Sequence, residues 1–418
     1  MTGTPTPAHR AWRSRVFVAT WLSYVGFYFC RKPFTSAKAA IGDQHHWSAT
    51  TLGNIYAAYL IAYSIGQFLA SRLGPRLGPR VNVLAGMALS IGVTVAMGVA
   101  LSPWVMGGLI AVNGLAQASG WSGNVGTMAS WFHKRERGRV MGAWATNFTV
   151  GAILSGLVMG WVLGAARWPW CFYTGALVLA AVWIQFYVLQ RNRPEDVGLA
   201  PIDDPVEVTA FEDPEPGLSR AAWTNLLLVA GFYFFAKLVR YAIWSWAAYF
   251  LHEKYGLGDR DANTYSTVFD ICGVPGVFLT GWISDRFFGI RRSGIALAMM
   301  IGMMAATALL LAFGGSNVTV FVVLLGAVGF FLYGPDALLS GAGAMDIGSR
   351  RAATFAAAVI SGFGSLGPIV QEVIIPRVYD EKTAGLGPVF GVLFASSALA
   401  ALFCLLLVLR NRRGGQGI

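Results

Sequence analysis

Residues 293–314 read SGIALAMMIGMMAATALLLAFG, an apolar stretch without a charged side chain. An α-helix of about 20 apolar residues crosses the hydrocarbon core of a bilayer, which is about 30 Å thick. The stretch is continuously apolar and does not alternate, which favours a helix over a strand of a membrane β-barrel. We therefore expect a transmembrane helix here.

Comparable stretches recur along the whole chain of 418 residues and predict twelve transmembrane helices. The composition agrees, because 56% of the residues are hydrophobic and only 12% are charged, whereas a soluble domain carries about 25% charged residues. These values exclude a cytosolic enzyme, a disordered chain and a disulfide-stapled secreted domain. The expected spans are residues 14–38, 49–72, 80–101, 103–128, 138–164, 169–190, 221–251, 262–285, 293–314, 317–344, 351–376 and 386–410.

Lysine and arginine residues are distributed unequally between the loops on the two sides of these helices. One set of loops, with both chain ends, carries 21 of these cations and the other set carries 6. Because cytoplasmic loops are enriched in Lys and Arg, both termini and the central loop are expected in the cytoplasm. The cations lie in short groups, so the net charge of +11 does not indicate a nucleic-acid partner. Of the 31 cations, Arg31, Lys32, Lys237 and Arg240 remain, inside predicted helices.

A polar segment separates two halves of the chain. Residues 191–219 contain five prolines and eight acidic residues. This composition predicts a cytoplasmic linker between an N-terminal half, residues 1–190, and a C-terminal half, residues 220–418.

The two halves also share sequence. Gly26-Phe27-Tyr28-Phe29 recurs as Gly231-Phe232-Tyr233-Phe234, and this offset of 205 places Lys32 opposite Lys237. A repeat of six plus six helices is typical of transporters that work by alternating access. The expected fold class is therefore an all-α membrane protein with twelve transmembrane helices in two pseudo-symmetric six-helix halves.

The four cations within the helices need compensation, since each costs roughly 2.5–3.5 kcal/mol at the centre of a span. The internal acids Asp270, Asp336 and Glu372 are too few to neutralise them together with the cytoplasmic bases. An anionic ligand would supply the remaining negative charge.

Lys237 and Arg240 lie three residues apart and therefore share a helix face, which Tyr233 and Trp244 extend. Two interpretations stay open for this pair: a buried ion pair with Asp270 or Asp336, or membership of a binding site.

Arg31 and Lys32 also have two interpretations. Pro33 follows them, so they could form an interfacial pair that ends the first helix. Alternatively, they join the polar stripe of Tyr24 and Tyr28, and Arg31 faces Arg240 across the two halves. Two guanidinium groups suit a phosphate, because each forms bidentate bonds with its oxygens.

Asp270 and Asp336 are either salt-bridge partners that exchange with substrate, protonation sites for proton coupling, or structural contacts. Tyr333-Gly334-Pro335 is expected to break its helix beside Asp336. The sequence contains no Gly-rich phosphate loop, metal-ligand spacing or catalytic arrangement in a soluble segment. We therefore expect neither an enzyme nor a metal or cofactor.

At these residues the chain resembles the major facilitator superfamily, specifically its organophosphate:phosphate antiporter family, which includes glycerol-3-phosphate and hexose-6-phosphate transporters. The resemblance spans nearly the whole chain. The motifs that carry it are Tyr28-x-x-Arg31-Lys32, Gly120-Trp121, Trp131, Glu136-Arg137-Gly138, Pro194 to Gly198-Leu199, Arg240-Tyr241, Trp246, Gly281 to Asp285-Arg286, Tyr333-Gly334-Pro335 and Arg351-Ala352-Ala353.

The resemblance implies that Arg31 and Arg240 bind the phosphate and that Asp270 is the family's helix-eight acid. Asp285 and Arg286 would form a cytoplasmic gating motif. The further substrate-binding residues that we expect are Lys237, Lys32, Tyr28 and Gln67.

The chain departs from the family pattern at four positions. Gln67 stands in place of a lysine, Phe148 of a histidine, Ser245 of an aspartate and Pro75 of an acid. Lys237 occupies a position that is usually uncharged, and its charge would replace the one missing at Gln67.

The leading hypothesis is an antiporter that exchanges an organophosphate, of the sugar phosphate or glycerol phosphate class, for inorganic phosphate. The alternatives are a proton-coupled symporter of another organic anion and a transporter-like membrane sensor of a phosphorylated metabolite. The family further implies a bacterial inner or plasma membrane, and we expect a monomer.

Overall fold

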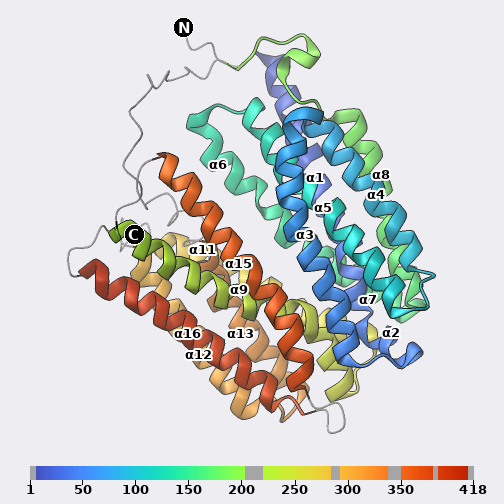
Figure 1. Cartoon of the computed structure of the whole chain (residues 1–418), viewed down its shortest axis with the longest axis vertical. Coiled ribbons are helices and arrows are strands. Elements are labelled where there is room, and N and C mark those ends of the chain that lie inside the picture. The colour runs from blue at the N-terminus through green and yellow to red at the C-terminus, as the bar shows by residue number, and fades with distance from the viewer. Residues whose placement is uncertain (1–5, 203–219, 284–291, 338–349, 380–384, 413–418) are drawn as a thin grey trace. The chain divides into compact units, whose positions relative to one another are not determined.

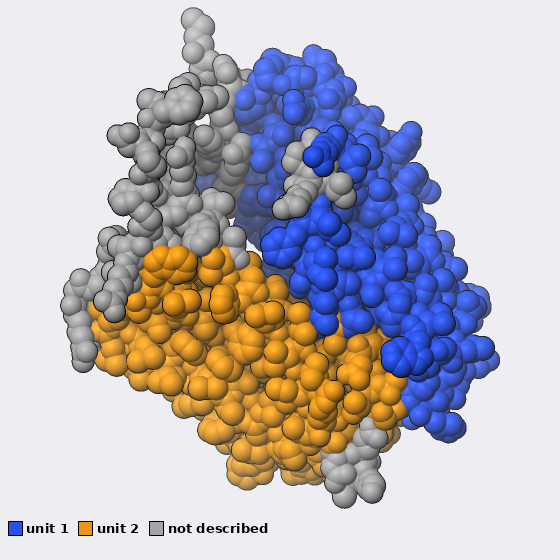
Figure 2. Space-filling view, in the orientation of Figure 1, with its two compact units in different colours: residues 1–47, 58–213 blue, residues 48–57, 214–418 orange. Residues whose placement is uncertain are grey.

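The computed structural model describes residues 6–202, 220–283, 292–337, 350–379 and 385–412. They are almost entirely helical and divide into two compact units. Unit 1 comprises residues 1–47 and 58–213, and unit 2 comprises residues 48–57 and 214–418, coloured blue and orange in Figure 2.

Several helices of unit 1 begin at residues that favour the first turn of a helix. Prolines begin α4, α5 and α8, where a missing N–H costs no intrahelical bond. The helices in the N-terminal part of the chain are α1 (Pro7–Ser36), α2 (Lys38–His45), α3 (Ala49–Leu77), α4 (Pro79–Met97), α5 (Pro103–Trp131), α6 (Lys134–Trp144), α7 (Thr146–Ala165) and α8 (Pro169–Leu189), followed by the 3₁₀ helix η1 (Pro194–Val197) (Figure 1).

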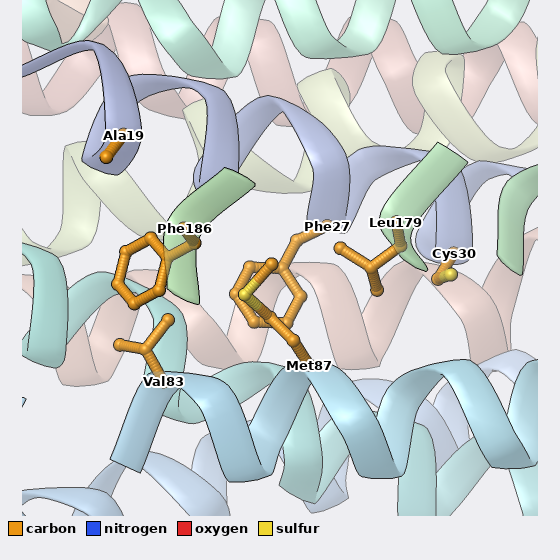
Figure 3. Packing of buried hydrophobic residues seen from close by; sticks show 7 residues of the cluster. All are labelled: Ala19, Phe27, Cys30, Val83, Met87, Leu179 and Phe186. Carbon is orange, nitrogen blue, oxygen red and sulfur yellow. The ribbon is translucent and has the colours of Figure 1, made fainter. Parts of the chain in front are cut away.

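Buried apolar side chains hold α1, α4 and α8 together. Phe27 of α1 and Met87 of α4 lie next to each other, and Leu179 and Phe186 of α8 flank them (Figure 3). Gly175 of α8 lies so close to the backbone of Phe29 that a Cβ atom would overlap its carbonyl oxygen. This close approach fixes the position of α1, which carries Arg31.

Unit 2 repeats the pattern of long helices. Its elements are the start of α3, α9 (Arg220–Tyr255), α10 (Asp259–Ser266), α11 (Val268–Ile283), α12 (Arg292–Phe313), α13 (Val318–Ala337), α15 (Arg350–Val378) and α16 (Gly387–Arg412). Glycines bring α11 and α13 together from both sides, because a Cβ atom on Gly276 would overlap the carbonyl of Phe330 and one on Gly329 the carbonyl of Phe269. Small residues allow membrane helices this close contact.

Within the described residues, nine helical segments are long and apolar enough to span a membrane. The other three expected spans correspond to α1, α3 and α5, whose hydropathy is lowered by polar residues such as Arg31, Gln67 and Gln117. Two expected spans are interrupted: α6 and α7 divide residues 138–164 at Ala145, and α10 and α11 divide residues 262–285 at Thr267.

The expected break at Tyr333-Gly334-Pro335 is wrong for the described part of this helix. α13 continues through Pro335 to Ala337. Pro335 removes one backbone hydrogen bond, while close packing of Gly276 and Gly329 holds α13 along α11 on the preceding turns.

The first part of the expected linker, residues 191–202, has a defined structure and contacts helices of unit 1. Asp196 accepts hydrogen bonds from the backbone N–H groups of Asn192 and Arg193, at 2.9 and 3.1 Å. The Arg80 guanidinium donates to the carbonyl of Gln190, at the end of α8, and His9 contacts the carbonyl of Ala200 at 3.1 Å. Residues 203–219 of the linker lie outside the described residues.

Candidate functional site

Arg31 lies in α1, and its side chain contacts three aromatic rings in unit 1. Its Nε donates a hydrogen bond to Oε1 of Gln117 at 3.0 Å. Its Cζ lies 4.8 Å from the ring centroid of Tyr28, 5.8 Å from that of Tyr59 and 5.1 Å from that of Tyr63. The side chain is 8% exposed, so the expectation of an interfacial pair does not match its burial. We call Arg31, Gln117 and these tyrosines the Arg31 cluster.

The Gln117 side chain is held in one orientation by buried neighbours. Its Oε1 also accepts a hydrogen bond from the Tyr59 hydroxyl at 2.9 Å, and its Nε2 donates to Asn113 Oδ1 at 3.2 Å and Ser90 Oγ at 3.3 Å. Asn113 in turn donates to the Cys30 carbonyl at 2.8 Å. Because the amide nitrogen has these acceptors, the amide oxygen faces Arg31.

Sequence analysis missed this network, although one signal was available. Asn113 and Gln117 lie four residues apart within an expected transmembrane helix, so they share a face. Buried polar side chains inside a membrane mark functional positions more often than surface ones do.

The electrostatic setting of Arg31 differs from that of an ordinary buried ion pair. No described carboxylate lies within 4 Å of its guanidinium, and its Nη2 atom is buried without a hydrogen-bond partner among the described residues. A buried charge without a counter-charge is costly. The cluster therefore presents an uncompensated positive group that favours an anion.

The other expected residues of unit 1 occupy different surroundings. Lys32 is 4% exposed, and Pro33 lies inside α1 instead of ending it. Gln67 lies one helical turn after Tyr63 on the same face of α3, and its side chain is exposed. No hydrogen bond or ion pair joins Gln67 to Arg31 in the part of the chain that the structure describes.

Arg240 forms a partly buried ion pair in unit 2. Its Nη1 lies 2.6 Å from Oδ2 of Asp336, and its Cζ lies 4.3 Å from the ring centroid of Tyr333. The hydroxyl of Tyr333 donates a hydrogen bond to the Asp270 carboxylate. Both acids are buried, at 4% exposure for Asp270 and 7% for Asp336. Tyr333 thus lies between the cation and the second acid.

Lys237 lies on the same face of α9 but has a different partner. Its Nζ lies 4.6 Å from the ring centroid of Tyr233, one turn earlier. Among the described residues, no carboxylate lies within ion-pair distance of Lys237. We call Arg240, Asp336, Tyr333, Asp270, Lys237 and Tyr233 the Arg240 cluster.

Further along α9, aromatic residues continue this face. The ring centroid of Trp244 lies 6.2 Å from that of Tyr241 and 6.3 Å from that of Tyr56, in the first turns of α3. Asp285 and Arg286, the expected gating motif, lie outside the described residues.

Long apolar helices that carry cations within their length in each unit are typical of a multi-pass membrane transport protein. The sequence model of the Major Facilitator Superfamily matches residues 16–371. The chain belongs to this superfamily and, within it, to the organophosphate:phosphate antiporter family, whose curated members are named as membrane transporters, exchangers and a sensor and not as enzymes.

Curated relatives match over most of their length. A glycerol-3-phosphate transporter of Bacillus subtilis (strain 168) is 30% identical, covering 95% of this chain and 92% of the relative. A glucose-6-phosphate exchanger of Danio rerio is 27% identical, with 97% and 94% coverage. The membrane sensor protein UhpC of Salmonella typhimurium is 27% identical, with 89% and 86% coverage.

A solved structure supports the fold. The crystal structure of a D-xylose-proton symporter superposes with a TM-score of 0.72 at 14% identity, covering 93% of this chain and 96% of that chain. The twelve-helix fold of the superfamily accommodates the described helices.

Proposed function

We propose that the protein is a secondary active antiporter that exchanges an organophosphate for inorganic phosphate, with Arg31 and Arg240 as the phosphate-binding residues. The observation that carries this proposal is the uncompensated Arg31 guanidinium in its aromatic surroundings. Relatives named as a glycerol-3-phosphate transporter and a glucose-6-phosphate exchanger support the substrate class and the exchange reaction.

The hydrogen bonds of Arg31 leave one nitrogen of the guanidinium without a described partner. Its Nε atom is engaged by Gln117, and Nη2 has no described partner. Hydrogen bonds between a guanidinium and a phosphate are charge-assisted and frequently bidentate. Phosphate bound to this nitrogen would neutralise the buried charge.

Arg240 binds the anion in competition with an internal acid. Asp336 holds its Nη1 at 2.6 Å, so a phosphate that binds Arg240 must displace this carboxylate. Substrate and Asp336 therefore stabilise different states of the same residue, and a ligand shifts a conformational equilibrium by its differential affinity for the two states. We propose that the halves 1–190 and 220–418 rock about the bound anion, and that the substrate gradients drive exchange.

Exchange of labelled phosphate in liposomes tests this proposal. Purified protein reconstituted with internal phosphate should take up labelled external phosphate, and Arg240→Lys should abolish the uptake because an ammonium lacks the planar donor fork. The matched control is Arg167→Lys, an exposed arginine that donates to Gln44. Uptake that survives Arg240→Lys would refute the phosphate site.

The sensor relative favours a second candidate function, a membrane protein that binds the phosphorylated ligand and signals without transport. Ligand binding without flux in liposomes would support the sensor. Uptake that collapses with a protonophore and needs no internal phosphate would instead support the proton-coupled symporter.

The proposal also includes the setting of the protein. We place the chain in a bacterial inner or plasma membrane as a monomer. Both termini are placed in the cytoplasm because the distribution of Lys and Arg predicts this orientation. Protease accessibility of terminal tags in right-side-out vesicles measures this orientation.

A further inference from the structure

Lys237 is the cation of the Arg240 cluster for which the described residues provide no carboxylate within ion-pair distance. Its ammonium lies against the ring of Tyr233 at 4.6 Å. That ring is held in place by Gly364 of α15, where a Cβ atom would overlap it. An aromatic face attracts a cation but does not neutralise its charge.

The nearby acids have other partners. Asp336 pairs with Arg240 at 2.6 Å, and Asp270 accepts the hydroxyl of Tyr333. Arg240 is in direct contact with Asp336, whereas the Lys237 ammonium, one helical turn away, has no described carboxylate in direct contact.

We propose that Lys237 binds a second anionic group of the substrate, and that the organophosphate is a phosphorylated carboxylic acid instead of a neutral polyol phosphate. This inference rests on the proposed function of Arg240 as a phosphate-binding residue. Residues three apart on a helix have Cβ atoms about 5–6 Å apart. The two side chains thus leave α9 close enough together for one small molecule to contact both with a phosphate and a carboxylate.

The chemistry of the two cations fits this division. Arg presents a planar fork that matches phosphate oxygens, whereas Lys is a compact point charge on a flexible stem. A neutral polyol phosphate would place a hydroxyl group against the ammonium and leave it without a direct ionic contact.

A pair of probes that differ in one group tests the proposal. 3-Phosphoglycerate and glycerol-3-phosphate share a three-carbon skeleton and a phosphate, and only the first carries a carboxylate. Their dissociation constants are measured by thermal shift on the purified full chain, because a ligand of the folded state raises the unfolding temperature. The variants are Lys237→Gln, Lys237→Arg and the control Lys254→Gln, which lies on α9 about 25 Å further along.

We expect the wild-type protein to prefer 3-phosphoglycerate, and Lys237→Gln to reduce the ratio of the two affinities by about tenfold, as loss of a charged hydrogen bond does. Lys237→Arg and Lys254→Gln should keep the preference. Equal weakening of both ligands in Lys237→Gln would overturn the inference, because Lys237 would then bind the phosphate itself. Absence of a preference in the wild-type protein would also overturn it.

The binding ratio is independent of transport. Failure of phosphate exchange in liposomes would remove the antiport proposal, while the ratio would still test the role of Lys237. A Lys237→Gln variant that does not fold is replaced by Lys237→Met, whose unbranched side chain is uncharged and one atom shorter than that of lysine.

Discussion

Gln117→Glu is expected to weaken phosphate binding strongly while leaving the protein folded. The substitution places a carboxylate where the amide oxygen now accepts from Arg31 Nε at 3.0 Å and from the Tyr59 hydroxyl at 2.9 Å. The new carboxylate supplies the counter-charge that Arg31 lacks among the described residues. An anionic substrate must then bind next to a fixed negative charge.

The magnitude follows from the geometry of the Arg31 cluster. A phosphate on the outer edge of the guanidinium lies about 6 Å from a carboxylate on the Nε side, and two unit charges at that separation repel by about 3 kcal/mol at an effective dielectric constant of about 20. Since 1.4 kcal/mol corresponds to a factor of ten, the dissociation constant for phosphate should rise about 100-fold.

The assay is phosphate binding by thermal shift, with unfolding in the absence of phosphate as a second readout. Gln117→Leu removes the acceptor without adding charge, and Gln190→Glu adds the same charge to another buried glutamine, which donates to Thr127. Thr127, which accepts this hydrogen bond, lies about 15 Å along α5 from Gln117. A Gln117→Glu protein that binds phosphate as the wild-type protein does, or no more weakly than Gln117→Leu, would refute the electrostatic reasoning.

Three further predictions concern the Arg240 cluster and the packing around it. Asp336→Asn removes the carboxylate that the partly buried Arg240 contacts, so the unfolding free energy should fall by about 1–3 kcal/mol and recover on phosphate addition, measured by denaturant unfolding. Tyr333→Phe keeps the ring but leaves Asp270 without its hydroxyl donor, and should lower the unfolding free energy by about 1–3 kcal/mol in the same assay. Gly329→Val forces apart α11 and α13 and should cost about 1–3 kcal/mol, whereas Gly391→Ala, where a Cβ atom meets nothing within 4 Å, should leave the melting temperature unchanged or raised.

The helices could be predicted from the sequence because hydropathy is a sum along the chain. Residues 293–314 and the comparable stretches can be recognised from their own composition, without knowledge of the helices that pack against them. The helix expected at residues 293–314 corresponds to α12, which spans Arg292–Phe313. Interruptions at Ala145 and Thr267 were not predicted, since both lie inside apolar stretches and depend on local backbone geometry. The defined structure of residues 191–200 was also not predicted, because it depends on contacts with Arg80 and His9, which are far away in the sequence.

The candidate site could be predicted only at the level of its charges. Arg31, Lys237 and Arg240 stand out in apolar surroundings, so the cost of burying a charge identifies them. The choice of Asp336 over Asp270 as the ion-pair partner of Arg240 depends on the rotation of helices about their axes, which periodicity does not fix.

The reciprocal glycine contacts of α11 and α13 have a mechanical consequence. With the two backbones in direct contact at Gly276 and Gly329, neither helix can slide along the other without a collision between carbonyl groups and ring systems. Asp270, Tyr333 and Asp336 are therefore held in fixed positions relative to one another, as a rigid group of hydrogen-bond acceptors and donors. In the proposed exchange cycle, the side chain of Arg240 on α9 would be the part that moves, releasing Asp336 when the anion binds.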